Sequence, residues 1–234
     1  MLLIPLKDDN PTGKFPIVTV IIIALNCLIF FYQKLLPAEM QFYFTVQYGY
    51  IPYELTHAAE LTPQMPFSTW LTPFTSMFMH ADYAHIAGNM LYLWIFGNNV
   101  EDFLGRARFV IFYIFAGLAA IALFTAVDFD GTTPLVGASG AIAGVMGAYF
   151  VVWPRARVMV LFWFIFFVRL FWLPAVFVLG AWIALQIIMG MATVGGPQMG
   201  GVAWFAHIGG FAYGYIFLRL AARHRTKTKR GRVV

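Results

Sequence analysis

The sequence predicts an all-α membrane protein built as a bundle of six transmembrane helices. Hydrophobic residues make up 61% of its 234 residues, and charged residues make up only 11%. Soluble globular domains carry roughly 45–50% apolar and about 25% charged residues, so a water-soluble enzyme is excluded. A disordered chain would need low hydrophobicity and is excluded too. The single cysteine, Cys27, leaves no partner for an intrachain disulfide and too few thiols for a cysteine-based zinc cluster.

Six apolar stretches approach the length of about 20 residues that a helix needs to cross the hydrocarbon core. These predicted spans are 15–36, 84–103, 109–127, 135–152, 171–191 and 202–222. A further apolar run, 158–168, covers about half a span, so we expect an interfacial or partly buried segment there. The first stretch is too long for the apolar core of a signal peptide, which predicts a retained helix.

The distribution of charge predicts the orientation of these spans. With six crossings, all 15 lysines and arginines except Lys34 fall on one side of the membrane. Because positively charged loops stay in the cytoplasm, we expect both termini there. We therefore divide the chain into a cytoplasmic N-terminal segment (1–14), a membrane domain (15–222) and a basic cytoplasmic tail (223–234). The tail could bind nucleic acid, but its position directly after a span favours an anchor on anionic lipid headgroups.

A few polar side chains within the predicted spans are candidates for function, because polar groups are costly in the membrane. Ser139 lies in the fourth span and His207 in the sixth, while His85 and Asn89 share one face of the second. Counted at 1.5 Å per residue from a cytoplasmic arginine, Ser139, His207 and Asn89 all lie roughly 18–25 Å deep. No Asp or Glu lies deep in a span, which excludes a paired-aspartate protease. The sequence also lacks the His-Glu-x-x-His motif of zinc metalloproteases, which argues against that class.

Glycine pairs accompany the serine and the histidine. Gly140 and Gly144 follow Ser139, and Gly210 and Gly214 follow His207. Small residues four apart let two helix backbones approach closely, which a short serine side chain needs in order to reach a histidine on another helix. The same glycines are also compatible with helix packing alone.

Taken together and in order, these motifs resemble the rhomboid intramembrane serine proteases, from the second span to the sixth. The family's His-x4-His-x3-Asn pattern appears as His80, His85 and Asn89. The stretch 97–106 is similar to the family's loop after that helix. The family's Gly-x-Ser-Gly motif appears as Gly137-Ala138-Ser139-Gly140. Its last catalytic helix is matched by Ala206-His207-Ile208-Gly209-Gly210.

The resemblance implies a six-span rhomboid-like fold and a serine endopeptidase with a catalytic dyad. Ser139 would be the nucleophile and His207 the general base and acid. His85 and Asn89 would stabilise the oxyanion together with the backbone N–H of Ser139. His80 lies off the face shared by His85 and Asn89, and we interpret it as structural.

The resemblance also implies substrates and a location. The substrates would be single-span transmembrane proteins cut near the outer face, with no metal, no cofactor and no nucleic acid involved. The location would be a bacterial plasma (inner) membrane. An alternative is a catalytically silent rhomboid-like protein that binds membrane clients, although the presence of both Ser139 and His207 argues against it. A small transporter or channel is a third reading, but no internal repeat supports a transporter.

The chain departs from the family where some members carry an aromatic ring four residues after the serine, stacked on the histidine. That position is Ala143 here, which leaves the orientation of His207 open. The glycine-rich loop 193–201 is either a mobile cap over the serine or a short connector. The fifth span, with Phe177 and Trp182, could form the side through which a substrate enters.

Overall fold

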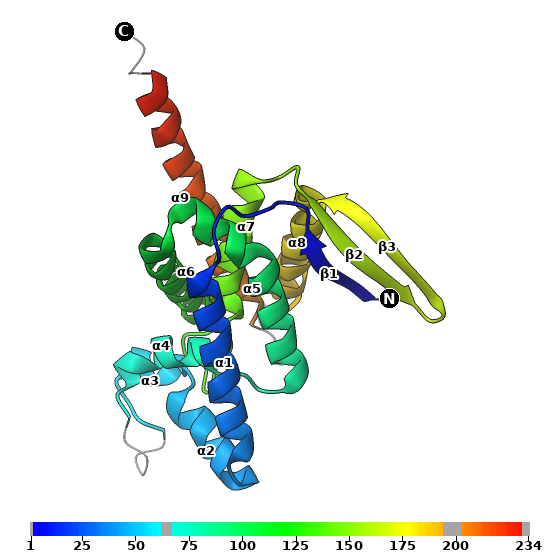
Figure 1. Cartoon of the computed structure of the whole chain (residues 1–234). Coiled ribbons are helices and arrows are strands. Elements are labelled where there is room, and N and C mark those ends of the chain that lie inside the picture. The colour runs from blue at the N-terminus through cyan, green and yellow to red at the C-terminus, as the bar shows by residue number, and fades with distance from the viewer. Residues whose placement is uncertain (1, 62–66, 194–202, 231–234) are drawn as a thin grey trace.

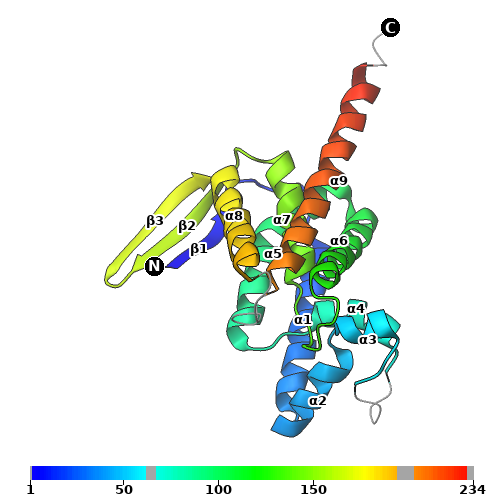
Figure 2. The ribbon, with the colours of Figure 1, turned by 180° about the vertical axis from the view of Figure 1, so that it is seen from behind.

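The computed structural model describes residues 2–61, 67–193 and 203–230. Six long helices pack into a bundle (Figures 1 and 2). They are α1 (Ile17–Leu35), α5 (Tyr83–Leu104), α6 (Arg106–Val127), α7 (Ser139–Val152), α8 (Ala175–Thr193) and α9 (Trp204–Arg230). Each corresponds to one of the six predicted stretches, although α7 and α8 each begin four residues later than predicted and α9 continues beyond 222 into the basic tail.

The chain is a mostly helical, multi-pass membrane protein. Within the described ranges, α1, α6 and α8 are long and apolar enough to cross a membrane, and α7 is a shorter apolar helix. Helices α5 and α9 are less apolar than these, because polar residues interrupt them, such as Asn89 and Asn99 in α5 and His207 in α9.

Short helical elements between α1 and α5 cap one end of the bundle, opposite the end where α9 emerges (Figure 1). They are α2 (Ala38–Tyr48), α3 (Pro52–His57), η1 (Thr69–Leu71), α4 (Thr72–Thr75) and η2 (Ser76–Phe78). Tyr50, which is fully buried, ties this region to the bundle. Its backbone forms an isolated bridge with Leu135, and its hydroxyl lies 2.6 Å from Thr125 Oγ1. The segment that leads into α7 is therefore held by the capping elements.

The expectation of an all-α fold is wrong in one region, because three strands form an antiparallel sheet in the order β1-β2-β3. The strands are β1 (Leu2–Asp8), β2 (Arg157–Phe164) and β3 (Phe167–Pro174). The half-span run 158–168 is thus part of a β-hairpin, and the predicted helix 171–191 begins only at Ala175. The hairpin is rich in valine and aromatic residues, which fit a pleated surface. Pairing with β1 satisfies the backbone groups along one edge of β2.

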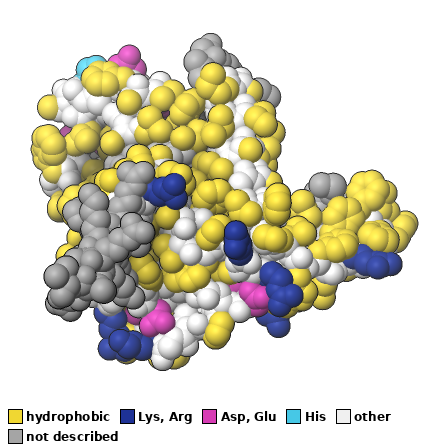
Figure 3. Space-filling view, turned by 90° about the horizontal axis from the view of Figure 1, so that it is seen from above, with side chains coloured by type: hydrophobic (Ala, Val, Ile, Leu, Met, Phe, Trp, Pro, Cys, Tyr) yellow, Lys and Arg dark blue, Asp and Glu magenta, His cyan; other side chains and the backbone are white. Residues whose placement is uncertain are grey.

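The sheet projects sideways from the bundle next to α8 (Figures 1 and 2). Its outer surface is strongly apolar: Phe166 at the hairpin tip is 98% exposed, and most of β3 is exposed as well. Figure 3 looks down on the end of the molecule where α9 emerges and shows apolar side chains across this sheet, with basic side chains beside them. Apolar exposure of this extent suits contact with lipid rather than with water.

Helix α7 forms the centre of the bundle. All its residues from Gly140 to Tyr149 are buried, as expected for an apolar helix surrounded by neighbours. A side chain at Gly210 would overlap the backbone carbonyl of Gly140, and one at Gly214 would overlap that of Gly144. The predicted close approach of these two helices at their glycine pairs is therefore confirmed, and it is what brings α9 next to the start of α7.

Candidate active site

Ser139 is the first residue of α7, directly after a tight turn. Gly137 in that turn has φ +132°, a conformation that side-chain-bearing residues rarely adopt. A Cβ at this position would also lie 2.8 Å from His85 Nε2. Glycine is therefore required on two grounds, and its absence of a side chain is what lets the His85 ring approach the serine turn.

Ser139 and His207 meet across the interface between α7 and α9. The serine Oγ lies 2.8 Å from His207 Nε2, a normal hydrogen-bond distance. Both side chains are only partly buried. Because Ser139 opens its helix, its backbone N–H belongs to the first turn, where amides have no intrahelical acceptor. The structure thus places a serine hydroxyl, a histidine base and a helix-start N–H in one place.

His85 and Asn89 come from the first two turns of α5. The Asp82 side chain caps this helix by accepting a hydrogen bond from His85 N at 2.8 Å, which fixes where the helix begins. Asn89 follows one turn later and is 8% exposed. Its buried Nδ2 has no acceptor among the described residues. An unpaired buried donor is costly, so this N–H group can gain by donating to an acceptor on a bound ligand.

His80 lies in the turn before α5 and is 1% exposed. Its ring packs edge-on against His85, with centroids 5.0 Å apart. Burial, and after it the nearby His85, lower the pKa of His80 to about 3, so this ring is neutral at physiological pH. Neither ring nitrogen has a hydrogen-bond partner in the described part of the chain. The structural role predicted for His80 stays a prediction, and this packing is compatible with it.

Two residues of α8 that sequence reasoning did not assign to the site contact His207. Gln186 Oε1 lies 2.7 Å from His207 Nδ1, and the Trp182 ring lies against the imidazole with centroids 5.6 Å apart. Ala143, at the position where some family members carry an aromatic residue, is buried and offers no ring. The sequence did offer one signal for Gln186, because it is a single glutamine in an otherwise apolar stretch. Such amides in membrane spans commonly hydrogen-bond to a neighbouring helix.

A small cavity of about 20 Å³ touches Ser139, Ser76 and Gly137. That volume is enough for one water molecule. No group of three or more His, Cys, Asp or Glu side chains within the described ranges is arranged to hold a metal ion. The loop 193–201, considered as a possible cap, lies outside the described residues apart from Thr193.

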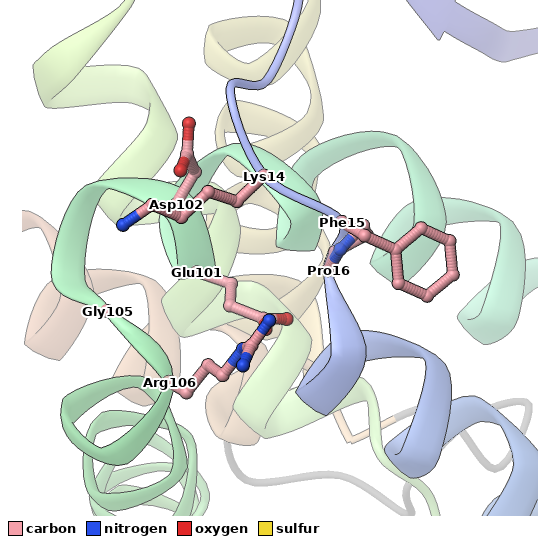
Figure 4. Close-up of a pocket in the computed structure, with 7 residues that line it drawn as sticks. All are labelled: Lys14, Phe15, Pro16, Glu101, Asp102, Gly105 and Arg106. Atoms are coloured by element: carbon pink, nitrogen blue, oxygen red, sulfur yellow. The ribbon is translucent and has the colours of Figure 1, made fainter.

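A larger cavity, of about 370 Å³, lies at the far end of α5 (Figure 4). It is lined by Lys14, Phe15, Pro16, Glu101, Asp102, Gly105 and Arg106. Glu101 is twelve residues beyond Asn89 on the same helix, about 18 Å along its axis. This cavity is therefore separate from the serine and histidine.

Comparison with known proteins matches most of this chain to one family. A family model described as a rhomboid domain matches residues 68–224. The chain is 34% identical over 137 residues to the rhomboid protease GluP of Bacillus subtilis, covering 58% of this chain and 24% of that protein. It is 30% identical over 148 residues to mitochondrial rhomboid protein 1 of Saccharomyces cerevisiae, covering 61% of this chain and 39% of the relative.

A third relative is the mitochondrial presenilin-associated rhomboid-like protein of Mus musculus. It is 32% identical over 148 residues, covering 61% of this chain and 36% of that protein. The matched region thus spans less than half the length of each of these relatives. The similarity concerns the membrane domain that holds the serine and the histidine.

Proposed function

The chain belongs to the rhomboid family, and on this premise we propose that it is an intramembrane serine endopeptidase with a Ser139–His207 dyad. The observation that carries the proposal is the 2.8 Å contact between Ser139 Oγ and His207 Nε2. A serine hydroxyl is a weak nucleophile until a neighbouring base takes its proton. His207 is the base within reach.

In the proposed first step, Ser139 Oγ attacks the carbonyl carbon of the scissile peptide while His207 Nε2 takes the hydroxyl proton. The carbonyl oxygen becomes an oxyanion. Preorganised donors stabilise such an oxyanion strongly where water is excluded. We assign this role to the Ser139 backbone N–H, His85 and Asn89. The unpaired Nδ2 of Asn89 and the placement of His85 against Gly137 support the assignment.

In the following steps, the protonated His207 donates its proton to the leaving amine, and the tetrahedral intermediate collapses to an acyl-enzyme on Ser139. A water molecule, deprotonated by the same imidazole, then attacks the ester, and His207 returns the proton to Ser139 Oγ as the acid is released. The small cavity beside Ser139 supports this step because it is large enough to hold a water next to the nucleophile.

The proposed substrate is a single-span transmembrane protein that is cut near the outer face of the membrane. All six long helices would cross the membrane, with both termini in the cytoplasm and residues 15–222 forming the membrane domain between a short N-terminal segment and the basic tail. In a bacterial cell this would be the plasma membrane. Phe177 on α8 is 68% exposed, which suits the side through which a substrate helix would enter.

Cleavage of a transmembrane model substrate by the purified protein tests the proposal. We expect the wild type to cleave it, and Ser139→Ala and His207→Ala to be inactive while remaining folded. Near-wild-type cleavage by either variant would reject the dyad. A folded wild type that binds transmembrane proteins without cutting any of a panel would favour the silent client-binding alternative.

A further inference from the structure

The base His207 is held from α8 rather than from α7. An amide oxygen can only accept a hydrogen bond, so the 2.7 Å contact between Gln186 Oε1 and His207 Nδ1 requires the imidazole proton to sit on Nδ1. In a neutral imidazole the other nitrogen is then an acceptor. That nitrogen is Nε2, which faces Ser139 Oγ. The tautomer set by Gln186 is thus the one that general-base catalysis needs.

The second half of the glutamine amide supports this orientation. Gln186 Nε2 points to the backbone carbonyl of Trp182, 3.4 Å away. Turning the amide over would place its oxygen against that carbonyl and its NH₂ against His207 Nδ1. The first contact would be repulsive, so the amide has one favourable orientation.

Gln186 occupies the narrow buried face of a helix that is otherwise largely exposed. The buried residues of α8 are Ala175, Leu179, Gln186 and Gly190, and Gln186 is 4% exposed. A Cβ at Gly190 would lie 3.3 Å from Trp204 Cβ, so this face packs closely against the start of α9. A buried polar side chain costs stability unless its groups are paired, and the partners of Gln186 are His207 and its own helix.

Trp182 limits the rotation of the same imidazole. It lies one turn before Gln186, on the same side of α8, and its ring is inclined at 39° to that of His207. Ala143 on α7 is buried and carries no ring, and the aromatic contact comes from α8 instead.

We propose that Gln186 is a positioning residue that holds His207 in the Nδ1–H tautomer, with Trp182 fixing the ring plane. This inference rests on the proposed serine protease function. It makes the activation of Ser139 depend on α8 remaining packed against α9. The neutral amide orients the histidine without adding a charge to the membrane interior.

The first test compares Gln186→Leu, which removes the acceptor, with Gln186→Glu, which keeps an acceptor oxygen at the same reach in either protonation state. Gln33→Leu is the matched control, because Gln33 is also a buried glutamine, 3% exposed. It lies on α1 and donates a hydrogen bond to Thr45 on α2. We expect Gln186→Leu to lower kcat about tenfold or more with KM unchanged, as for one lost buried hydrogen bond. Gln186→Glu should stay within about threefold of wild type.

Labelling of Ser139 by a small fluorophosphonate should fall in parallel with kcat, because it reports nucleophile activation without entry of a substrate helix. Gln33→Leu should label at the wild-type rate. Wild-type kcat and labelling in Gln186→Leu, or equal losses in Gln186→Leu and Gln33→Leu, would overturn the proposal.

The second test reads the tautomer in the unmodified protein and does not depend on turnover or on the folding of a variant. The ¹⁵N shifts of His207, assigned by comparison with His207→Ala, should show a protonated Nδ1 and an unprotonated Nε2. The opposite tautomer would refute the role of Gln186 even in an active enzyme. A wild type that cleaves, with an inactive Ser139→Ala and a normal Gln186→Leu, would reject this inference while leaving the proposed function in place.

Discussion

Glu101 near the end of α5 caps the start of α1 from another helix: its Oε2 accepts hydrogen bonds from both Thr19 N and Thr19 Oγ1, each at 2.8 Å. Its Oε1 accepts from Val18 N at 3.0 Å. Helix α1 has no side-chain cap of its own, and its first-turn amides would otherwise be unpaired. Glu101 is 3% exposed, so this carboxylate joins the first two long helices inside the protein.

Replacing Glu101 with alanine should therefore destabilise the fold. The change leaves the buried Thr19 N–H and the partly buried Val18 N–H without this acceptor, and a hydrogen bond to a charged group contributes about 1.5–3 kcal/mol. We expect a loss of about 2–3 kcal/mol, measured by reversible unfolding in mixed detergent micelles. The neighbouring Asp102, which accepts a single exposed bond from Gly13 N, is the control. If Asp102→Ala costs as much as Glu101→Ala, the capping argument is wrong.

The oxyanion assignment predicts a specific kinetic pattern. His85→Ala and Asn89→Ala should lower kcat more than they raise KM, because they remove contacts made mainly in the transition state. Loss of one such donor costs on the order of 10²–10³ in rate in soluble serine proteases, and less where donors overlap. Steady-state kinetics beside thermal unfolding of each variant measures this. A stable double variant with unchanged kcat would remove both residues from the mechanism.

Buried His80 predicts a pH-dependent stability. Its pKa is about 3 in the folded protein, against 6.5 in a model compound, so the unfolded chain binds one more proton between these values. The stability gained by burying His80 as a neutral ring is complete above about pH 6.5 and is lost as the pH falls toward 3.

His80→Phe should make this part of the pH dependence shallower. Because both ring nitrogens lack partners in the described residues, an apolar ring of similar size should be tolerated. Unfolding midpoints between pH 7 and pH 4 give the comparison. An identical slope in wild type and variant would mean that His80 is not buried as a neutral group.

The proposed topology can be tested with single cysteines in a Cys27→Ala background. Glu60 and Arg108 are both exposed and lie on opposite sides in the six-span arrangement. A membrane-impermeant maleimide added to intact spheroplasts should label Glu60→Cys and not Arg108→Cys. After lysis both should react. Labelling of Arg108→Cys in intact spheroplasts would reject cytoplasmic termini.

The sequence by itself predicted the parts of this protein that depend on local pattern. Apolar stretches of sufficient length predicted the six long helices, because the hydrocarbon core sets that length. The glycine pairs predicted the close contact of α7 and α9, which the structure confirms through Gly210 and Gly214. The sequence also indicated that Ser139 and His207 share a level, and their side chains meet at 2.8 Å. Their catalytic role stays a prediction.

Tertiary structure alone decided the features that join distant segments. Strand β1 pairs with β2, which follows about 150 residues later. The turn between β2 and β3 carries Ile165 with φ +55°, where a sequence signal for a hairpin would be Asn-Gly. Gln186 is one polar residue in an apolar stretch, and only the rotation of α8 against α9 decides that its amide faces His207 rather than lipid. Periodicity fixes which residues share a face of one helix, but the partner of that face depends on packing between helices.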